Sequence, residues 1–110
     1  MVTCGDDKKV IIYEISEAGY VKKTEVDGLH SRCIYSCSWS QNSDFIATAG
    51  SDNKVYVSEL LKGDEFLLEP RLQSPPSEGH KNDVNCVAFH PSLNLLASCS
   101  DDRTIKVWNF

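Results

Sequence analysis

One segment near the C-terminus shows the repeating pattern of this chain most clearly: Leu96-Ala97-Ser98-Cys99-Ser100-Asp101-Asp102-Arg103-Thr104-Ile105-Lys106-Val107-Trp108-Asn109. Two short apolar and β-branched runs flank Asp101-Asp102-Arg103. Such runs favour strands, and aspartate favours turns because its side chain bonds to nearby backbone. The segment therefore predicts two antiparallel strands, near 95–100 and 104–109, joined by a tight turn.

The same pattern occurs twice more in the 110 residues. A shift of 50 residues superimposes a second copy on this one, and a further shift of 45 residues superimposes a first copy on the second. The first copy lacks its beginning. The matched polar positions are His30 with His80, Thr3 and Thr48 with Ser98, and Asp7 and Asp52 with Asp102. Fixed internal periods of this length are typical of repeat architectures.

The remaining strands follow from the same alternation of apolar runs and turn residues. Strands are expected near 2–5, 9–15, 20–26, 34–40, 45–50, 54–60, 65–69 and 84–90. Gly63-Asp64 should form a turn. The stretch Glu69–Gly79, with Ser74-Pro75-Pro76-Ser77 inside it, should form a long loop, because proline cannot donate to a strand ladder. The chain is thus predicted to be all-β.

The third copy resembles the WD-repeat family. It begins with Gly79-His80 and ends with Trp108-Asn109, and Asp102 follows His80 at an offset of 22 positions. The resemblance implies a partial β-propeller of four-stranded antiparallel blades, cut from a seven-bladed ring. About two and a half blades are expected: an incomplete blade at 1–29, a complete blade with the proline-containing loop at 30–79, and a last blade lacking its fourth strand at 80–110. We therefore expect a fragment or a truncated gene product.

The resemblance also implies a buried hydrogen-bond relay in each repeat. The expected members are His80, Ser98, Asp102 and Trp108 in the last repeat, His30, Thr48 and Asp52 in the middle one, and Thr3 and Asp7 in the first. The middle repeat has Ser58 and the first has Tyr13 where tryptophan is expected. A hydrolase triad of His80, Ser98 and Asp102 is the alternative interpretation, but no Gly-x-Ser-x-Gly elbow is present. The chain is predicted not to be an enzyme.

Cofactor and metal sites are not expected. The chain has five cysteines, and only Cys33 and Cys37 lie close together. Their spacing and number do not match zinc or iron–sulfur sites, which need about four ligands, often in pairs two residues apart. Free cysteine in a strand acts as a small apolar residue. No glycine-rich phosphate loop occurs either.

Binding is expected at the loops of one propeller face, since loops on a rigid scaffold often carry function. The candidate partner-binding residues are Arg32, Asn53, Lys81, Asn82, Asp83 and Arg103. The formal net charge of −5 and the scattered basic residues argue against nucleic acid. No apolar run is long enough to span a bilayer, and the N-terminus has no signal-peptide pattern. A cytoplasmic or nuclear location with reduced thiols is expected.

A narrower resemblance concerns the WD-repeat proteins of cytosolic iron–sulfur protein assembly. It is carried by the segment 30–35 with Trp39, by the segment 83–88, and by Leu96–Asp102. It implies a scaffold in the complex that delivers iron–sulfur clusters, with the targeting subunits and client apoproteins as partners. A generic WD-repeat adaptor of a coat, chromatin or ubiquitin-ligase complex is the alternative. The isolated chain is expected to need its missing blades or to self-associate.

Overall fold

Ten strands form three antiparallel sheets in the computed structural model of the chain, which describes residues 1–110 throughout. The first sheet has the order β1 (Val2–Cys4), β2 (Lys9–Ser16), β3 (Gly19–Asp27). The second has β4 (Ile34–Trp39), β5 (Phe45–Gly50), β6 (Val55–Lys62), β7 (Phe66–Gln73), and the third has β8 (Val84–Phe89), β9 (Leu95–Ser100), β10 (Ile105–Asn109). The predicted all-β class is confirmed. No helix that could cross a membrane is present.

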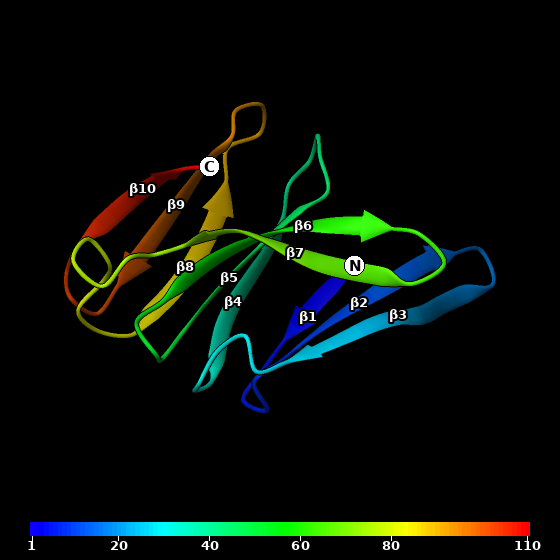
Figure 1. The fold of residues 1–110 in the computed structure, drawn as a ribbon, viewed down its shortest axis with the longest axis horizontal. Helices are drawn as coiled ribbons and strands as arrows, with labels where there is room; N and C mark the ends of the chain where they lie inside the picture. The colour runs from blue at the N-terminus through cyan, green and yellow to red at the C-terminus, as the bar shows by residue number, and fades with distance from the viewer.

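The sheets stand side by side in chain order, from the blue first sheet to the orange and red last sheet (Figure 1). Each is a meander, in which consecutive strands pair. This topology follows from the short turns, because a few residues can only return the chain antiparallel to itself. The repeat in sequence is therefore also a repeat in space, with one sheet for each copy.

The β1–β2, β5–β6 and β9–β10 turns have the same backbone conformation. The third residue of each turn has a positive φ, which is 65° at Lys8 and 68° at both Asn53 and Arg103. This left-handed conformation is common for asparagine and uncommon for lysine or arginine. The turns are closed by three matching amide-to-carbonyl bonds, Lys8 to Gly5 (3.2 Å), Asn53 to Gly50 (3.3 Å) and Arg103 to Ser100 (3.1 Å).

One strand is longer than the sequence predicts. The stretch from Glu69 was expected to be loop, but β7 continues to Gln73 and includes Pro70. Proline is tolerated because β7 is the edge strand of its sheet, where the ladder needs no donor on the outer side. An irregularity in the β6–β7 register lies beside it and leaves Arg71 without a partner opposite. The loop therefore begins only at Ser74.

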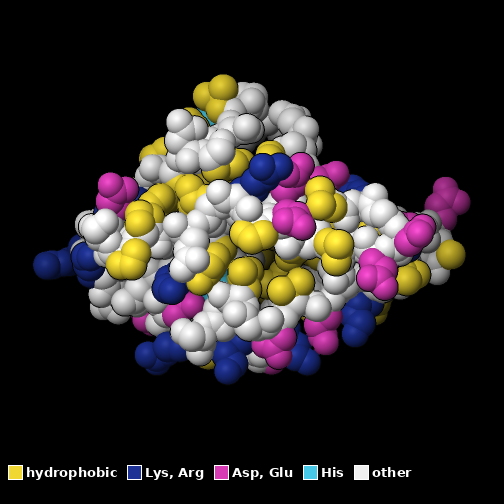
Figure 2. All heavy atoms as spheres, in the orientation of Figure 1, with side chains coloured by type: hydrophobic (Ala, Val, Ile, Leu, Met, Phe, Trp, Pro, Cys, Tyr) yellow, Lys and Arg dark blue, Asp and Glu magenta, His cyan; other side chains and the backbone are white.

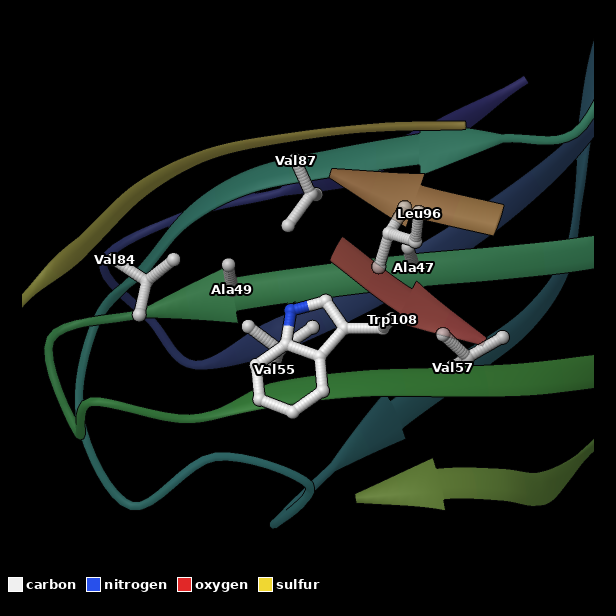
Figure 3. Packing of buried hydrophobic residues seen from close by; sticks show 8 residues of the cluster. All are labelled: Ala47, Ala49, Val55, Val57, Val84, Val87, Leu96 and Trp108. Carbon is white, nitrogen blue, oxygen red and sulfur yellow. The ribbon is translucent and has the colours of Figure 1, made fainter. Parts of the chain in front are cut away.

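The core lies between the sheets. Between the second and third sheets, eight buried residues pack together: Ala47, Ala49, Val55, Val57, Val84, Val87, Leu96 and Trp108. The indole of Trp108 lies in the middle of this cluster, close to Val55 (Figure 3). A second cluster joins the first and second sheets and consists of Val10, Ile12, Ile34, Ile46 and Leu60. The middle sheet contributes residues to both clusters, so it is buried on both of its faces.

The outer face of the last sheet remains open to solvent. Ile105 and Val107 are 76% and 66% exposed, although the equivalent Val55 and Val57 of the middle sheet are fully buried. On the face seen in Figure 2, hydrophobic side chains also gather near the centre, over β6 and β7 of the middle sheet, with charged side chains mostly around the rim. The same apolar strand pattern thus serves as core in one sheet and as surface in another.

Candidate functional site

A chain of hydrogen bonds runs through the last repeat, and it links the four side chains that the sequence groups together. The indole N–H of Trp108 donates to Oγ of Ser98 over 2.8 Å, and Oγ of Ser98 lies 2.8 Å from Nε2 of His80. On the other side of the ring, Nδ1 of His80 lies 2.9 Å from a carboxylate oxygen of Asp102. Because a carboxylate can only accept, Nδ1 carries the proton and Nε2 accepts from the serine hydroxyl.

Asp102 collects several further donors at the turn. Its carboxylate accepts the backbone N–H of Lys81 at 3.0 Å, the backbone N–H of Thr104 at 2.9 Å and the hydroxyl of Thr104 at 2.6 Å. Burial favours the neutral acid, but the bonds from Thr104, Lys81 and His80 outweigh it and hold the pKa of Asp102 well below its usual value. Asp102 is therefore an anion at neutral pH.

Thr104 is a member of this network that the sequence analysis does not identify. Its hydroxyl also lies 3.2 Å from Nδ1 of His80. The equivalent residue of the middle repeat is Lys54, whose side chain makes no such bond there. The only sequence feature that could have indicated this role is a threonine two residues after the network aspartate, because a hydroxyl at that position can donate a hydrogen bond to the carboxylate.

Burial limits the chemistry that these residues can perform. Ser98 is 2% exposed and His80 is 5% exposed. The serine hydroxyl is occupied on both sides, since it accepts from Trp108 and donates to His80. No buried side-chain nitrogen or oxygen in the chain lacks a partner. A nucleophile needs an open approach for its substrate, and the burial of Ser98 leaves none in this arrangement.

The middle repeat holds a shorter version of the same network. Nε2 of His30 lies 2.8 Å from the hydroxyl of Thr48, and Nδ1 lies 3.0 Å from each carboxylate oxygen of Asp52. Ser58 occupies the tryptophan position, so the network ends at Thr48. Burial lowers the pKa of His30 despite the opposing effect of Asp52, and the ring is neutral at pH 7.

The first repeat holds no relay. It has no histidine within the described residues, and Thr3 and Asp7 are not bonded to each other. Thr3 pairs with Ile11 in the β1–β2 ladder, while a carboxylate oxygen of Asp7 accepts the backbone N–H of Lys9 at 3.1 Å. The aspartate thus keeps its role in the turn, but the connection to the serine or threonine position is missing.

The aspartates of the two histidine networks, Asp52 and Asp102, also hold the candidate binding loops in place. Asp52 accepts the backbone N–H of Ser31 at 3.1 Å, as Asp102 accepts that of Lys81. Each bond ties the loop before the first strand of a sheet to the turn after its second strand. As a result Arg32 lies in the loop beside the Asn53 turn, and the 81–83 loop lies beside the Arg103 turn.

The loops of the two repeats meet at a hollow of about 290 Å³. Asn53 and Lys81 both line it, together with the proline-containing loop. Arg32 and Arg103 do not line this hollow, and both side chains are exposed. Asn82 and Asp83 are fixed by hydrogen bonds to the Asp101 turn. The backbone carbonyl of Asn82 accepts the Ser100 hydroxyl at 3.1 Å, and that of Asp83 accepts the backbone N–H of Asp101 at 3.0 Å.

The cysteines do not gather into a metal site. No group of three or more histidine, cysteine or acidic side chains is placed to hold an ion. Cys37 instead lies beside Cys4, and its thiol is 3.8 Å from the carbonyl oxygen of Val2. Burial, together with the neighbouring Cys4, raises the pKa of Cys37 to about 12, so this thiol is protonated at neutral pH. A metal-free protein remains a prediction.

Comparison with known proteins adds two findings. The family pattern described as "WD domain, G-beta repeat" matches residues 24–57 and 73–109. The chain is 38% identical over 98 residues to the bovine "Probable cytosolic iron-sulfur protein assembly protein CIAO1", a match that covers 86% of this chain and 29% of that protein. It is also 38% identical over 87 residues to the CIAO1 homolog of Nematostella vectensis and to human CIAO1, with 77% of this chain covered in each case.

These comparisons agree with the geometry. The chain spans less than a third of the length of the relatives. The family match extends over more than half of the chain and includes both histidine networks. Three meander sheets, a shared turn conformation and the two networks are what a WD repeat requires. The chain therefore belongs to the WD-repeat family.

Proposed function

We propose that the chain is part of a non-catalytic scaffold that binds proteins of the cytosolic iron–sulfur assembly machinery. The observation that carries this proposal is the 38% identity to the bovine protein named for that process, over 86% of the chain. The named relatives are described as cytosolic, and the chain has free cysteines, which fits a reducing compartment. The expected location is therefore the cytoplasm.

The histidine networks are assigned a supporting role in this scaffold. Each joins the strands of a sheet to its loops through an aspartate that is bonded to a loop amide. Buried polar groups that are fully paired make a local structure rigid and specific. A loop that is already rigid loses less entropy when a partner binds. The networks thus favour recognition without contacting the partner themselves.

The proposed contact surface consists of Arg32, Asn53, Lys81, Asn82, Asp83 and Arg103. Two separate arginines and one lysine in exposed loops suit a partner with acidic side chains, and arginine is frequent at interface hot spots. Client apoproteins and the targeting subunits are the proposed partners. No catalytic step is assigned to Ser98, because its hydroxyl is buried and engaged on both sides.

The test is recovery of iron–sulfur apoproteins and assembly proteins with the tagged protein from cells. Arg32→Glu combined with Arg103→Glu should reduce this recovery and leave the thermal unfolding unchanged, because both side chains project into solvent. Lys22→Glu with Lys23→Glu is the matched control, since these residues lie on the outer strand β3. Equal recovery of partners by both double variants would exclude the loops as the contact surface.

Recovery of a different set of proteins would overturn the assignment to iron–sulfur assembly. A coat, chromatin or ubiquitin-ligase complex that is lost on the same double substitution would leave the scaffold role and the loop surface in place. Such a result would change only the cellular process to which the scaffold is assigned.

A further inference from the structure

Two of the five cysteines are exposed, and these two face each other. Cys86 in β8 and Cys99 in β9 are exposed free thiols, whereas Cys4, Cys33 and Cys37 are half-buried. Cys86 and Cys99 are direct partners in the antiparallel ladder, and the irregularity in this strand pair comes before Cys86. Side chains of directly opposed residues project from the same face of a sheet.

The strand geometry permits a bond between the two sulfurs. Directly opposed residues of antiparallel strands have Cα atoms about 4.5 to 5.5 Å apart. A disulfide requires a separation of roughly 4.4 to 6.8 Å. Cys86 and Cys99 can therefore be joined without a change of register. Their Cβ atoms start slightly further apart than in a relaxed disulfide, so thiols such as glutathione should reopen the bond readily.

The surroundings leave the pair open to small reagents. Both cysteines line a shallow hollow of about 210 Å³ on the outer face of the last sheet. Their neighbours there include Ala88 and Ala97, whose methyl groups leave room for the sulfurs to approach. The hydroxyl of Ser36 donates to Sγ of Cys86 over 3.8 Å, and bonds to sulfur are weak enough to be given up when the side chain turns.

We propose that Cys86 and Cys99 form a redox-active dithiol site that hydrogen peroxide converts to a cross-strand disulfide. One sulfur attacks a peroxide oxygen, the O–O bond breaks, and a sulfenic acid and one water form. The second thiol then attacks the sulfenic sulfur, the S–S bond forms, and a second water leaves. The two thiols together lose two protons and two electrons, and the peroxide is reduced to two waters.

The other close pair of cysteines provides a contrast within the same chain. Cys4 and Cys37 lie between the first and second sheets, and burial and mutual proximity raise the pKa of Cys37. The thiolate is the nucleophile in thiol oxidation, so a thiol that stays protonated reacts slowly. Oxidation should thus select the exposed pair.

Oxidation would change the surface that the last sheet presents. In the middle sheet, the positions equivalent to Cys86 and Cys99 are Ser36 and Ala49, and Ala49 is fully buried against the last sheet. The equivalent face of the last sheet is open, and a disulfide between β8 and β9 would occupy the hollow on that face. Any protein surface that packs on this face would therefore meet a different shape in each oxidation state.

The test uses the reduced 110-residue chain, treated with one equivalent of hydrogen peroxide, quenched with an alkylating reagent and analysed by mass spectrometry. We expect the loss of two hydrogens and alkylation of three cysteines instead of five. Chymotrypsin cuts after Phe89 and the leucines that separate the two cysteines, so the bridge should join one peptide containing Cys86 to another containing Cys99. Excess reduced glutathione should restore five alkylated cysteines.

Variants make the assignment specific. Cys86→Ser and Cys99→Ser should each prevent the intramolecular bridge, whereas Cys33→Ser should leave it unchanged. If a variant does not fold, the peptide map of the unsubstituted chain still decides. A bridge between Cys4 and Cys37, disulfide-linked dimers in place of an internal bridge, or five thiols still alkylated after peroxide would each overturn the proposal. All of these results are independent of the proposed scaffold function, which is tested by partner recovery.

Discussion

Ser98 and Trp108 are joined by a buried hydrogen bond of 2.8 Å from the indole nitrogen to the hydroxyl oxygen, across neighbouring strands of the last sheet. The same hydroxyl donates to His80, so one small side chain satisfies two larger ones. In the middle sheet the tryptophan position is Ser58, and the corresponding network is shorter by one bond. The last sheet therefore depends more strongly on its central hydroxyl.

Replacement of that hydroxyl should be costly. Ser98→Ala would leave the Trp108 N–H and the His80 ring nitrogen without partners in a buried site, which costs about 1 to 3 kcal/mol of unfolding free energy. Urea unfolding measures the loss. Ser92→Ala is the matched control, because Ser92 lies in an exposed turn and should change stability by no more than about 0.5 kcal/mol. Equal losses in the two variants would contradict the role of the network.

A glycine at the end of β5 allows two strands to approach closely. A Cβ built on Gly50 would lie 2.3 Å from the carbonyl oxygen of Cys33, whereas one on Gly63 would have nothing closer than the Glu65 carbonyl oxygen at 3.7 Å. Gly50→Ala should therefore destabilise the chain by roughly 1 to 3 kcal/mol, as overpacking usually does. Gly63→Ala is the control and should be neutral or slightly stabilising, because alanine restricts the unfolded chain. Thermal unfolding separates the two, and a stable Gly50→Ala variant would show that the close approach is not required.

Acid should weaken the fold in two steps. Burial in the folded chain lowers the pKa of His30 below its ordinary value of 6.5, so the unfolded chain takes up the proton more readily. The stability that this histidine contributes is complete above pH 6.5 and is lost as the pH falls below it. Folding also lowers the pKa of Asp102 below 3.8, so its contribution is lost only at more acidic pH.

Urea midpoints between about pH 7.5 and pH 5 measure the first step, where unperturbed histidine titrates. The His30→Gln variant cannot titrate at this position and should show a smaller decrease over the same range, although its stability at pH 7.5 is lower. A midpoint that rises as the pH falls from 6.5 would contradict the direction of the His30 shift.

The absence of catalysis can be tested directly at Ser98. A fluorophosphonate reagent labels serines that are nucleophilic and accessible. Ser98 has a buried hydroxyl that is bonded on both sides, so it should remain unlabelled when a serine hydrolase added to the same reaction is labelled completely. Mass spectrometry of the peptide containing Ser98 provides the measurement. A stoichiometric adduct on Ser98 would restore the hydrolase interpretation.

Most strands could be located from the sequence because the repeat determines them three times. The positions of Asp7, Asp52 and Asp102 place the same turn in each copy, and the strands on both sides follow from their apolar pattern. The extension of β7 through Pro70 could not be located in this way. Whether proline is tolerated depends on which strand is at the edge, and that is a property of the assembled sheet.

The sequence by itself determined the all-β class and the repeat, because these depend on spacing along the chain. The family resemblance implied the histidine, hydroxyl and aspartate positions of the two networks, but it did not include Thr104. The tertiary structure alone decided which strands are covered. Ile105 and Val55 occupy equivalent positions, yet Ile105 is largely exposed and Val55 is fully buried, because burial depends on whether another sheet packs on that face. The pairing of Cys86 with Cys99 was likewise decided by the register of two strands, since the 12 residues between them give no indication that the two thiols meet.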